Sequence, residues 1–181
     1  SEIERIKEED EEVHKRLKEI NDRINKEDKD VHDKLRDEAR KIEERLRRVM
    51  EELRANGVPK SLLDEARRVI DELRRKLEKV LDELEKLNRK TEEDNRRLHE
   101  ETRKVNEDTK RKLKEVKDNR SDEKVIRKLL EEIRRINEEL ERRNRKLMKD
   151  IREINERAEE KLRRLAEEIE ELIKKLKEEV K

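Results

Sequence analysis

The sequence predicts an all-α protein, a long antiparallel up-down-up three-helix bundle with coiled-coil-like packing. Apolar residues make up 28% of the 181 residues. This share is close to that of a coiled-coil seam, which fills about two of every seven positions. These residues recur at helical spacing, and charged residues make up another 60%. Gly57 and Pro59, the only Gly and Pro, share one short loop, so long stretches on either side contain no helix breaker.

Start and stop signals divide the chain into three helices. Ser1, Ser61 and Ser121 each precede a long run without helix breakers, and we expect their hydroxyls to cap the first turns. Gly57 and Asn119 suit the left-handed residue that ends a helix. The predicted helices span residues 2–55, 62–117 and 122–180. Because short loops make neighbouring helices antiparallel, we expect residues 1–181 to form one domain.

Each predicted helix carries an apolar stripe that another helix can cover. Residues 35–87 and 156–180 supply layers that are mostly Leu, Ile, Val and Ala, and we expect this half to act as a simple apolar clamp. In the first helix a Val-His pair recurs after 18 residues, at 13–14 and 31–32. Eighteen residues is about five turns at 3.6 residues per turn, so the repeat suits a nearly straight helix.

A track of polar residues runs beside each apolar stripe, with steps of seven, four and seven. The three tracks are His14, Asn21, Asn25 and His32; then Asn88, Asn95, His99 and Asn106; then Asn137, Asn144, Met148 and Asn155. Aligning them in an antiparallel bundle predicts four cross-sections. These contain His14, Asn106 and Asn137; Asn21, His99 and Asn144; Asn25, Asn95 and Met148; and His32, Asn88 and Asn155. The threonines Thr91, Thr102 and Thr109 lie on the same part of the second helix.

We interpret this track as a buried hydrogen-bond network that selects one helix register. A buried amide or imidazole without a partner costs about 1–3 kcal/mol, so a register slip that separates several of them is unfavourable. The predicted network consists of His14, Asn21, Asn25, His32, Asn88, Thr91, Asn95, His99, Thr102, Asn106, Asn137, Asn144 and Asn155. The alternative is that these side chains flank the seam and are solvated.

Buried neutral histidines would also make the bundle sensitive to acid. A neutral imidazole donates from one nitrogen and accepts at the other. Protonation removes the acceptor and places a charge in a dry layer, so we expect stability to fall as the pH decreases.

The residue types exclude several kinds of chemistry. The chain has no Cys and therefore no disulfide or thiolate. His14 and His32 are five turns apart, about 27 Å along one helix, so they cannot share a metal ion. No HExxH motif or Gly-rich phosphate loop occurs. We therefore expect no catalytic residues, no metal and no cofactor.

Charge and hydropathy limit the possible partners. The net charge is +1 and aromatic residues are absent, which argues against nucleic-acid binding. No apolar run approaches the roughly 18 residues of a membrane-spanning segment. We expect a soluble chain without a natural localisation, found in the cytoplasm of an expression host. A monomer is favoured, and self-association through helix faces is the alternative.

Taken together, these features resemble computationally designed helical bundles that place hydrogen-bond networks in chosen layers. The residues that carry the resemblance are the Glu/Lys/Arg surfaces of the type SEIERIKEEDEE, the serines sixty residues apart and the polar layers. Some members of that class place His in the networks to respond to acid. Spectrin-type repeats share the three-helix topology, but they usually carry aromatic residues and Gln, both absent here.

The resemblance implies a structural scaffold without enzymatic activity. The alternative is an interaction or self-assembly module whose polar track lies between chains. A natural tethering coiled coil is a third hypothesis. The mass in solution would separate the scaffold from the interaction module.

Overall fold

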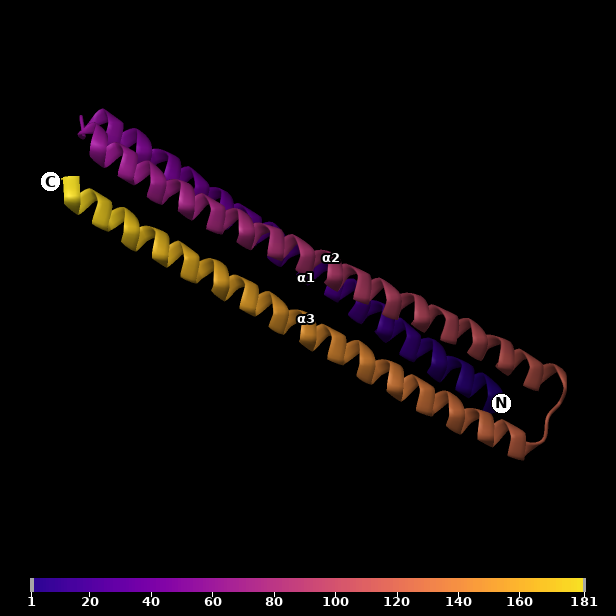
Figure 1. The fold of residues 1–181 in the computed structure, drawn as a ribbon. Helices are drawn as coiled ribbons and strands as arrows, with labels where there is room; N and C mark the ends of the chain where they lie inside the picture. Colours follow the sequence, from indigo (N-terminus) through magenta and orange to yellow (C-terminus); the bar gives the residue numbers. More distant parts are fainter. Residues whose placement is uncertain (1, 181) are drawn as a thin grey trace. The chain divides into compact units, whose positions relative to one another are not determined.

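The computed structural model describes residues 2–180 and consists of three helices joined by two short loops (Figure 1). The helices are α1 (Glu2–Ala55), α2 (Lys60–Asp118) and α3 (Glu123–Val180). No strand occurs within residues 2–180, and segments of all three helices share each apolar core. The predicted all-α three-helix bundle is confirmed. The predicted cap by Ser1 lies outside the described residues.

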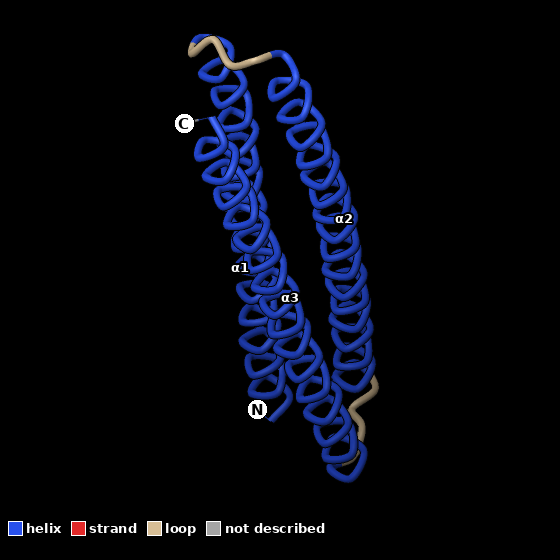
Figure 2. Tube along the Cα trace, turned by 60° about the vertical axis from the view of Figure 1, so that its left-hand side comes forward, coloured by secondary structure: helices blue, strands red, loops and turns tan. Residues whose placement is uncertain are grey.

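The first connection (Figure 2) ends α1 with a Schellman motif. The amide of Val58 donates to the Leu53 carbonyl at 3.4 Å, and the amide of Gly57 donates to the Arg54 carbonyl at 3.3 Å. Gly57 has φ +66°, the left-handed conformation that glycine adopts without steric cost. Val58 and Leu53 are both buried in one core cluster, which is the apolar contact that accompanies this motif.

The second connection ends α2 with the same six-to-one hydrogen bond, but the left-handed residue is not a glycine. The Ser121 amide donates to the Val116 carbonyl at 3.3 Å, which places Arg120 at the left-handed position. Arg120 has φ +45°, so the prediction of Asn119 for this role is wrong by one residue. The six-to-one hydrogen bond sets this position, and asparagine preference does not override it.

The helix starts also differ from the serine caps predicted at Ser61 and Ser121. The carbonyl of Pro59 accepts the amides of Leu62 and Leu63 at 3.0 Å, so α2 begins at Lys60 and Ser61 lies within its first turn. At α3 the carboxylate of Asp122 accepts the Val125 amide at 3.1 Å. Aspartate is as good a cap as serine and stands one residue closer to the helix.

The contacts divide the chain into two compact units, each containing a segment of every helix. The polar unit comprises Ser1–Asp28 and Lys90–Arg152, and the apolar unit comprises Lys29–Arg89 and Glu153–Lys181. The names reflect the buried residues: nine of the eleven buried polar side chains belong to the polar unit, and His32 and Asn155 are the other two. The expectation of one domain stays a prediction.

The apolar unit has a continuous core of aliphatic side chains. Leu46 and Val49 of α1 are completely buried, and Ile70 of α2 and Leu162 of α3 are 1% exposed. The whole cluster contains only Leu, Ile, Val, Ala and Met. Burying a side chain of this size contributes about 1.5–3 kcal/mol relative to exposure, so this core is the main source of stability in the unit.

The core of the polar unit is smaller and interrupted. One apolar cluster contains Ile6, Leu113, Leu129 and Ile133. Other buried aliphatic residues, such as Leu17, alternate along their helices with buried amides, threonines and aspartates. The described part of this unit therefore buries polar groups that must find hydrogen-bond partners.

The ion pairs on the surface show the same residue offsets within each of the two units. The α1–α3 pairs are all 125 residues apart: Glu9–Arg134, Arg16–Glu141 and Glu27–Arg152 in the polar unit, and Arg45–Glu170 and Glu52–Lys177 in the apolar unit. The residue numbers of the α2–α3 pairs always add to 244: Glu101–Arg143, Lys112–Glu132, Glu83–Lys161 and Lys76–Glu168. The register of each unit is therefore regular along its helices.

None of the helical segments within residues 2–180 is both long enough and apolar enough to cross a membrane.

Candidate functional site

The predicted network is buried at most of its positions. Eight of its members are buried: Asn21, His32, Thr91, Asn95, Thr102, Asn137, Asn144 and Asn155. His14, Asn88 and Asn106 are half-buried, and Asn25 and His99 are exposed. Thr109 is also buried. Buried histidine and buried asparagine and threonine hydrogen bonds are therefore present in the bundle.

An asparagine clasp joins α1 to α2 in the polar unit. The amide nitrogen of Asn21 donates to the side-chain oxygen of Asn95 at 2.6 Å. The amide nitrogen of Asn95 donates in turn to the oxygen of Asn25 at 2.5 Å. Asn95 is 2% exposed and is held between two residues one turn apart on α1. The pair Asn25–Asn95 belongs to a predicted cross-section, whereas the pair Asn21–Asn95 does not.

A buried aspartate, Asp10, joins α1 to α3 in the same unit. Asp10 is 1% exposed, and its carboxylate accepts a hydrogen bond from the Asn137 amide nitrogen at 2.9 Å. His14, one turn further along α1, places Nε2 at 3.4 Å from the same carboxylate oxygen. Asn137 and His14 belong to one predicted cross-section, and the structure connects them through Asp10.

A second buried aspartate bonds to a threonine. The Thr91 hydroxyl of α2 donates to the Asp28 carboxylate of α1 at 2.8 Å. Thr91 is 2% exposed and Asp28 is 4% exposed. A hydrogen bond to a charged group contributes about 1.5–3 kcal/mol, so this bond is among the stronger polar links between α1 and α2.

Two other buried members of the track bond to their own helices. The Thr102 hydroxyl donates to the Leu98 carbonyl at 2.7 Å, and the Asn144 amide nitrogen donates to the Leu140 carbonyl at 2.8 Å. Each acceptor is four residues earlier in the same helix, the local bond that these side chains favour within helices. These two bonds satisfy the donors without selecting a neighbouring helix.

The remaining members lie in the apolar unit. His32 is 5% exposed and lines a cleft of about 210 Å³ with Leu35, Leu81 and Leu84. Arg36 and Glu85 also line this cleft. Asn155 is buried and Asn88 half-buried.

The prediction that the network is buried is wrong at two positions, Asn25 and His99. Asn25 lies eight positions after the buried Leu17, about 80° around the axis of α1. His99 directly follows the buried Leu98, about 100° around α2. Both residues are exposed, although the Asn25 oxygen still accepts a hydrogen bond from the buried Asn95. The structure also does not hydrogen-bond Asn21, His99 and Asn144 as one cross-section, because Asn21 pairs with Asn95.

Asp10 and Asp28 were missed because aspartates in a highly charged helix resemble surface residues. The signal that identifies them is an extension of the 18-residue repeat. The sequence Glu-Asp-x-x-Val-His occurs at 9–14 and again at 27–32. The repeat extends to α3, where Arg-x-Ile-Asn occurs at 134–137 and 152–155. In both copies of the repeat an aspartate directly follows an ion-paired glutamate. This repetition indicates that the aspartate and the glutamate lie in different environments.

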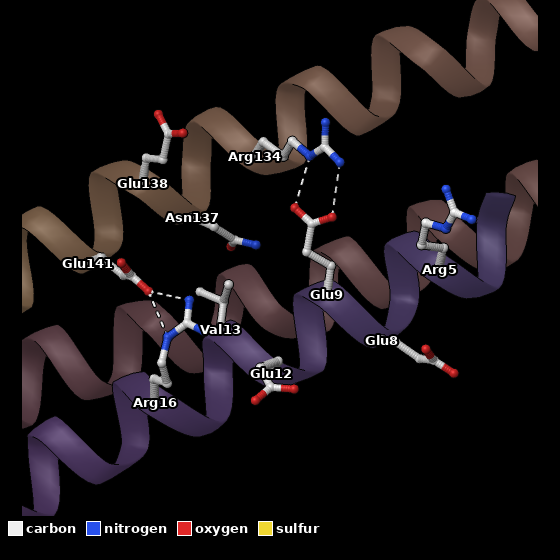
Figure 3. A pocket seen from close by; sticks show the side chains of 10 residues that line it. All are labelled: Arg5, Glu8, Glu9, Glu12, Val13, Arg16, Arg134, Asn137, Glu138 and Glu141. Carbon is white, nitrogen blue, oxygen red and sulfur yellow. Dashed lines mark hydrogen bonds and ion pairs between the residues drawn. The ribbon is translucent and has the colours of Figure 1, made fainter.

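One ion pair of the repeat, Glu9–Arg134, lies at the surface of a groove between α1 and α3 (Figure 3). Figure 3 shows Asn137 between the pair Glu9–Arg134 and the pair Arg16–Glu141. Arg134 donates two hydrogen bonds to Glu9, at 2.9 and 3.0 Å. These hydrogen bonds hold the pKa of the Glu9 carboxyl below its ordinary value, against the opposing effects of desolvation and of nearby Asp10.

Hydrogen bonds from arginine also lower the pKa of two other glutamates of the polar unit. Hydrogen bonds from Arg152 lower the pKa of Glu27, and hydrogen bonds from Arg143 lower the pKa of Glu101. In each case burial opposes the shift and is outweighed. These carboxylates are therefore stabilised in their charged form when the bundle is folded.

Within residues 2–180, no three or more His, Asp or Glu side chains gather in a way that could hold a metal ion. The arrangement instead supplies directional polar links between helices. The clasp and the two aspartates connect specific residues, whereas aliphatic contacts tolerate a shift along the helix.

No family model, curated protein or solved structure matches the chain.

Proposed function

We propose that this protein is a computationally designed structural scaffold, in which buried polar groups specify the register of a three-helix bundle. The observation that carries the proposal is the clasp of Asn95 between Asn21 and Asn25. A shift of α1 along α2 by one heptad would separate these amides and leave buried groups without partners, at about 1–3 kcal/mol each.

The regular surface register supports the design part of the proposal. Within the described residues, the α1–α3 ion pairs share one residue offset and the α2–α3 pairs share one residue sum. The repeat of Glu-Asp-x-x-Val-His on α1 after 18 residues is accompanied by a matching repeat on α3. Repetition of whole polar cross-sections on straight helices is what parametric construction produces.

Cysteine cross-linking tests the register directly, because the chain has no cysteine of its own. One variant carries Arg16→Cys and Glu141→Cys, at the positions of an observed ion pair. The matched control carries Arg16→Cys and Met148→Cys, one heptad out of register. We expect a disulfide in the first variant and none in the second.

The same two cysteine pairs are then placed in a chain with Asn21→Leu, Asn25→Leu and Asn95→Leu, which removes the clasp. If the amides specify the register, the apolar chain should form both disulfides. A single in-register disulfide in the apolar chain would contradict the proposal, because the aliphatic contacts alone would then select the register.

The proposal includes a loss of stability in acid, centred on His32. Its cleft is walled by three leucines, and the charges that also line it, Arg36 and Glu85, are of opposite sign. Asp28 precedes His32 by one turn on α1. Burial among aliphatic side chains disfavours the charged form of an imidazole in general, which is the reason for proposing an acid response.

Guanidinium unfolding at about pH 7.5 and about pH 5, where histidine changes charge, tests this response. We expect the parent to lose more stability in acid than a His32→Asn variant. The control is His99→Asn, which changes an exposed histidine and should respond as the parent does. Equal acid responses of the parent and His32→Asn would show that this histidine does not contribute.

A further inference from the structure

The Nε2 atom of the half-buried His14 is itself buried and has no hydrogen-bond partner among the described residues. The side chain of His14 is 8% exposed. The nearest charged group is the Asp10 carboxylate, whose oxygen lies 3.4 Å away without the geometry of a hydrogen bond. The buried Asp10 carboxyl group and the buried Nε2 atom of His14 therefore lie side by side, an arrangement that a cation would stabilise.

Their separation matches two ligands of one metal ion. Imidazole nitrogen and carboxylate oxygen bind Zn²⁺ at about 2.0–2.1 Å, so two ligands of a tetrahedral ion lie about 3.3–3.4 Å apart. His14 and Asp10 are one turn apart on the same face of α1, and their spacing of 3.4 Å has this value. The helix thus holds both ligands in place before an ion arrives.

An amide oxygen supplies a further ligand. Asn137 is 5% exposed and its nitrogen lies 2.9 Å from the Asp10 oxygen, while its own oxygen has no hydrogen-bond partner among the described residues. Rotation of this amide by half a turn exchanges the two atoms and directs the oxygen at the site.

The groove between α1 and α3 gives an ion access to Asn137. Its volume is about 680 Å³, and it is lined by five glutamates and three arginines, together with Val13 and Asn137 (Figure 3). The excess of carboxylates raises the local concentration of cations. An imidazole among the ligands favours a transition ion such as Zn²⁺ or Co²⁺ over Mg²⁺ or Ca²⁺.

We propose that Asp10, His14 and the Asn137 amide oxygen form a binding site for a divalent transition-metal ion in the polar unit. The site needs one histidine, so the distance between His14 and His32 does not oppose it. With two strong ligands, binding is weaker than in structural zinc sites, which use four. The inference is independent of the register proposal, because the register could be specified whether or not an ion binds.

The test uses a chain in which His14 is the only histidine, obtained by His32→Asn and His99→Asn and carrying no polyhistidine tag. Zn²⁺ is titrated into this chain by calorimetry, and Co²⁺ is followed by its visible absorption. We expect one equivalent of either ion to bind, and the unfolding midpoint to rise with Zn²⁺ concentration, because the ion binds the folded state.

Two further substitutions separate this site from the many carboxylates of the surface. Adding His14→Asn, or separately Asp10→Asn, should weaken Zn²⁺ binding by at least about tenfold, because each removes one of the two strong ligands. Glu11→Gln is the matched control, since Glu11 is exposed on the same helix, and it should leave the affinity unchanged. Equal affinities of all these chains, or no binding at all, would overturn the proposal.

Nuclear magnetic resonance keeps the test decisive if Asp10→Asn unfolds the chain. In the chain with His14 alone, one equivalent of Zn²⁺ should shift the Nε2 resonance of His14 far more than its Nδ1 resonance. An unshifted Nε2 resonance at saturating Zn²⁺ would show that the ion binds elsewhere, and the proposal would be wrong.

Discussion

Thr91 of α2 donates a 2.8 Å hydrogen bond to the Asp28 carboxylate of α1, and both side chains are buried. In the polar unit, side-chain hydrogen bonds also join α1 to another helix at the buried residues Asn95 and Asp10. Each of these hydrogen bonds can be removed without changing the charged surface, so its contribution can be measured separately.

Thr91→Val removes the donor to Asp28 and preserves the shape of the side chain. We expect a loss of about 1.5–3 kcal/mol in the free energy of unfolding, because a buried carboxylate loses a hydrogen bond. Thr102→Val is the matched control: Thr102 is also buried on α2 but bonds only to the Leu98 carbonyl of its own helix. Denaturant unfolding of both variants measures the difference, and equal losses would contradict a specific role of Asp28.

Asn95→Ala removes the centre of the asparagine clasp. Both Asn21 and Asn25 lose their partner, and the buried Asn21 amide cannot reach solvent easily, so we expect a loss of about 1–3 kcal/mol beyond that of the control. The control is Asn144→Ala, because Asn144 is also 2% exposed but bonds within its own helix. Chemical denaturation provides the comparison. A variant Asn144→Ala as destabilised as Asn95→Ala would refute the distinction.

Arg120→Gly should stabilise the protein. Arg120 has φ +45° at the end of α2, a conformation that costs a residue with a Cβ about 1–2 kcal/mol. Because glycine loses more backbone entropy on folding, we expect a net gain of about 0.5–1 kcal/mol. Asn119→Gly, one residue earlier and without a positive φ, should give no gain. Thermal unfolding would distinguish the two variants.

The glutamates paired with arginine give a separate acid response. Hydrogen bonds from arginine lower the pKa values of Glu9, Glu27 and Glu101. Their contribution is therefore complete above the unfolded pKa of about 4.3 and is lost as the pH falls through the lower folded values. A variant with all three changed to Gln should be less stable than the parent at about pH 6 and equally stable at about pH 2.

Because these pairs are exposed, the difference should be small and should shrink further in high salt. Urea unfolding across this pH range measures it without adding salt. A stability difference that persists unchanged at the acid end would mean that the substitutions act through something other than the carboxylate charges.

The boundaries of the helices were predictable to within two residues, but their caps were not. The start of α2 is set by the Pro59 carbonyl, two residues before Ser61, and that of α3 by Asp122, next to Ser121. Several neighbouring residues can cap a helix equally well. The choice among them depends on where the loop must leave the previous helix, which local sequence does not contain.

The candidate site was predictable in residue type and only partly in pairing. The seven-four-seven track indicated a polar seam, and most of its members are buried. Asn25 and His99 fall on its outer edge because four residues turn a helix about 40° beyond a full turn. Whether that rotation exposes a side chain depends on where the two neighbouring helices lie.

By itself, the sequence determined three long helices, their order and the segregation of aliphatic from polar layers, because these follow from helical periodicity and from two loop signals. The tertiary structure alone decided the environments of Glu9 and Asp10. These adjacent carboxylates lie about 100° apart around α1. One pairs with Arg134 at the surface and the other with Asn137 inside. Two adjacent carboxylates thus form a solvated ion pair and a buried hydrogen bond. The reason is that only the packing of three helices defines which direction is inward.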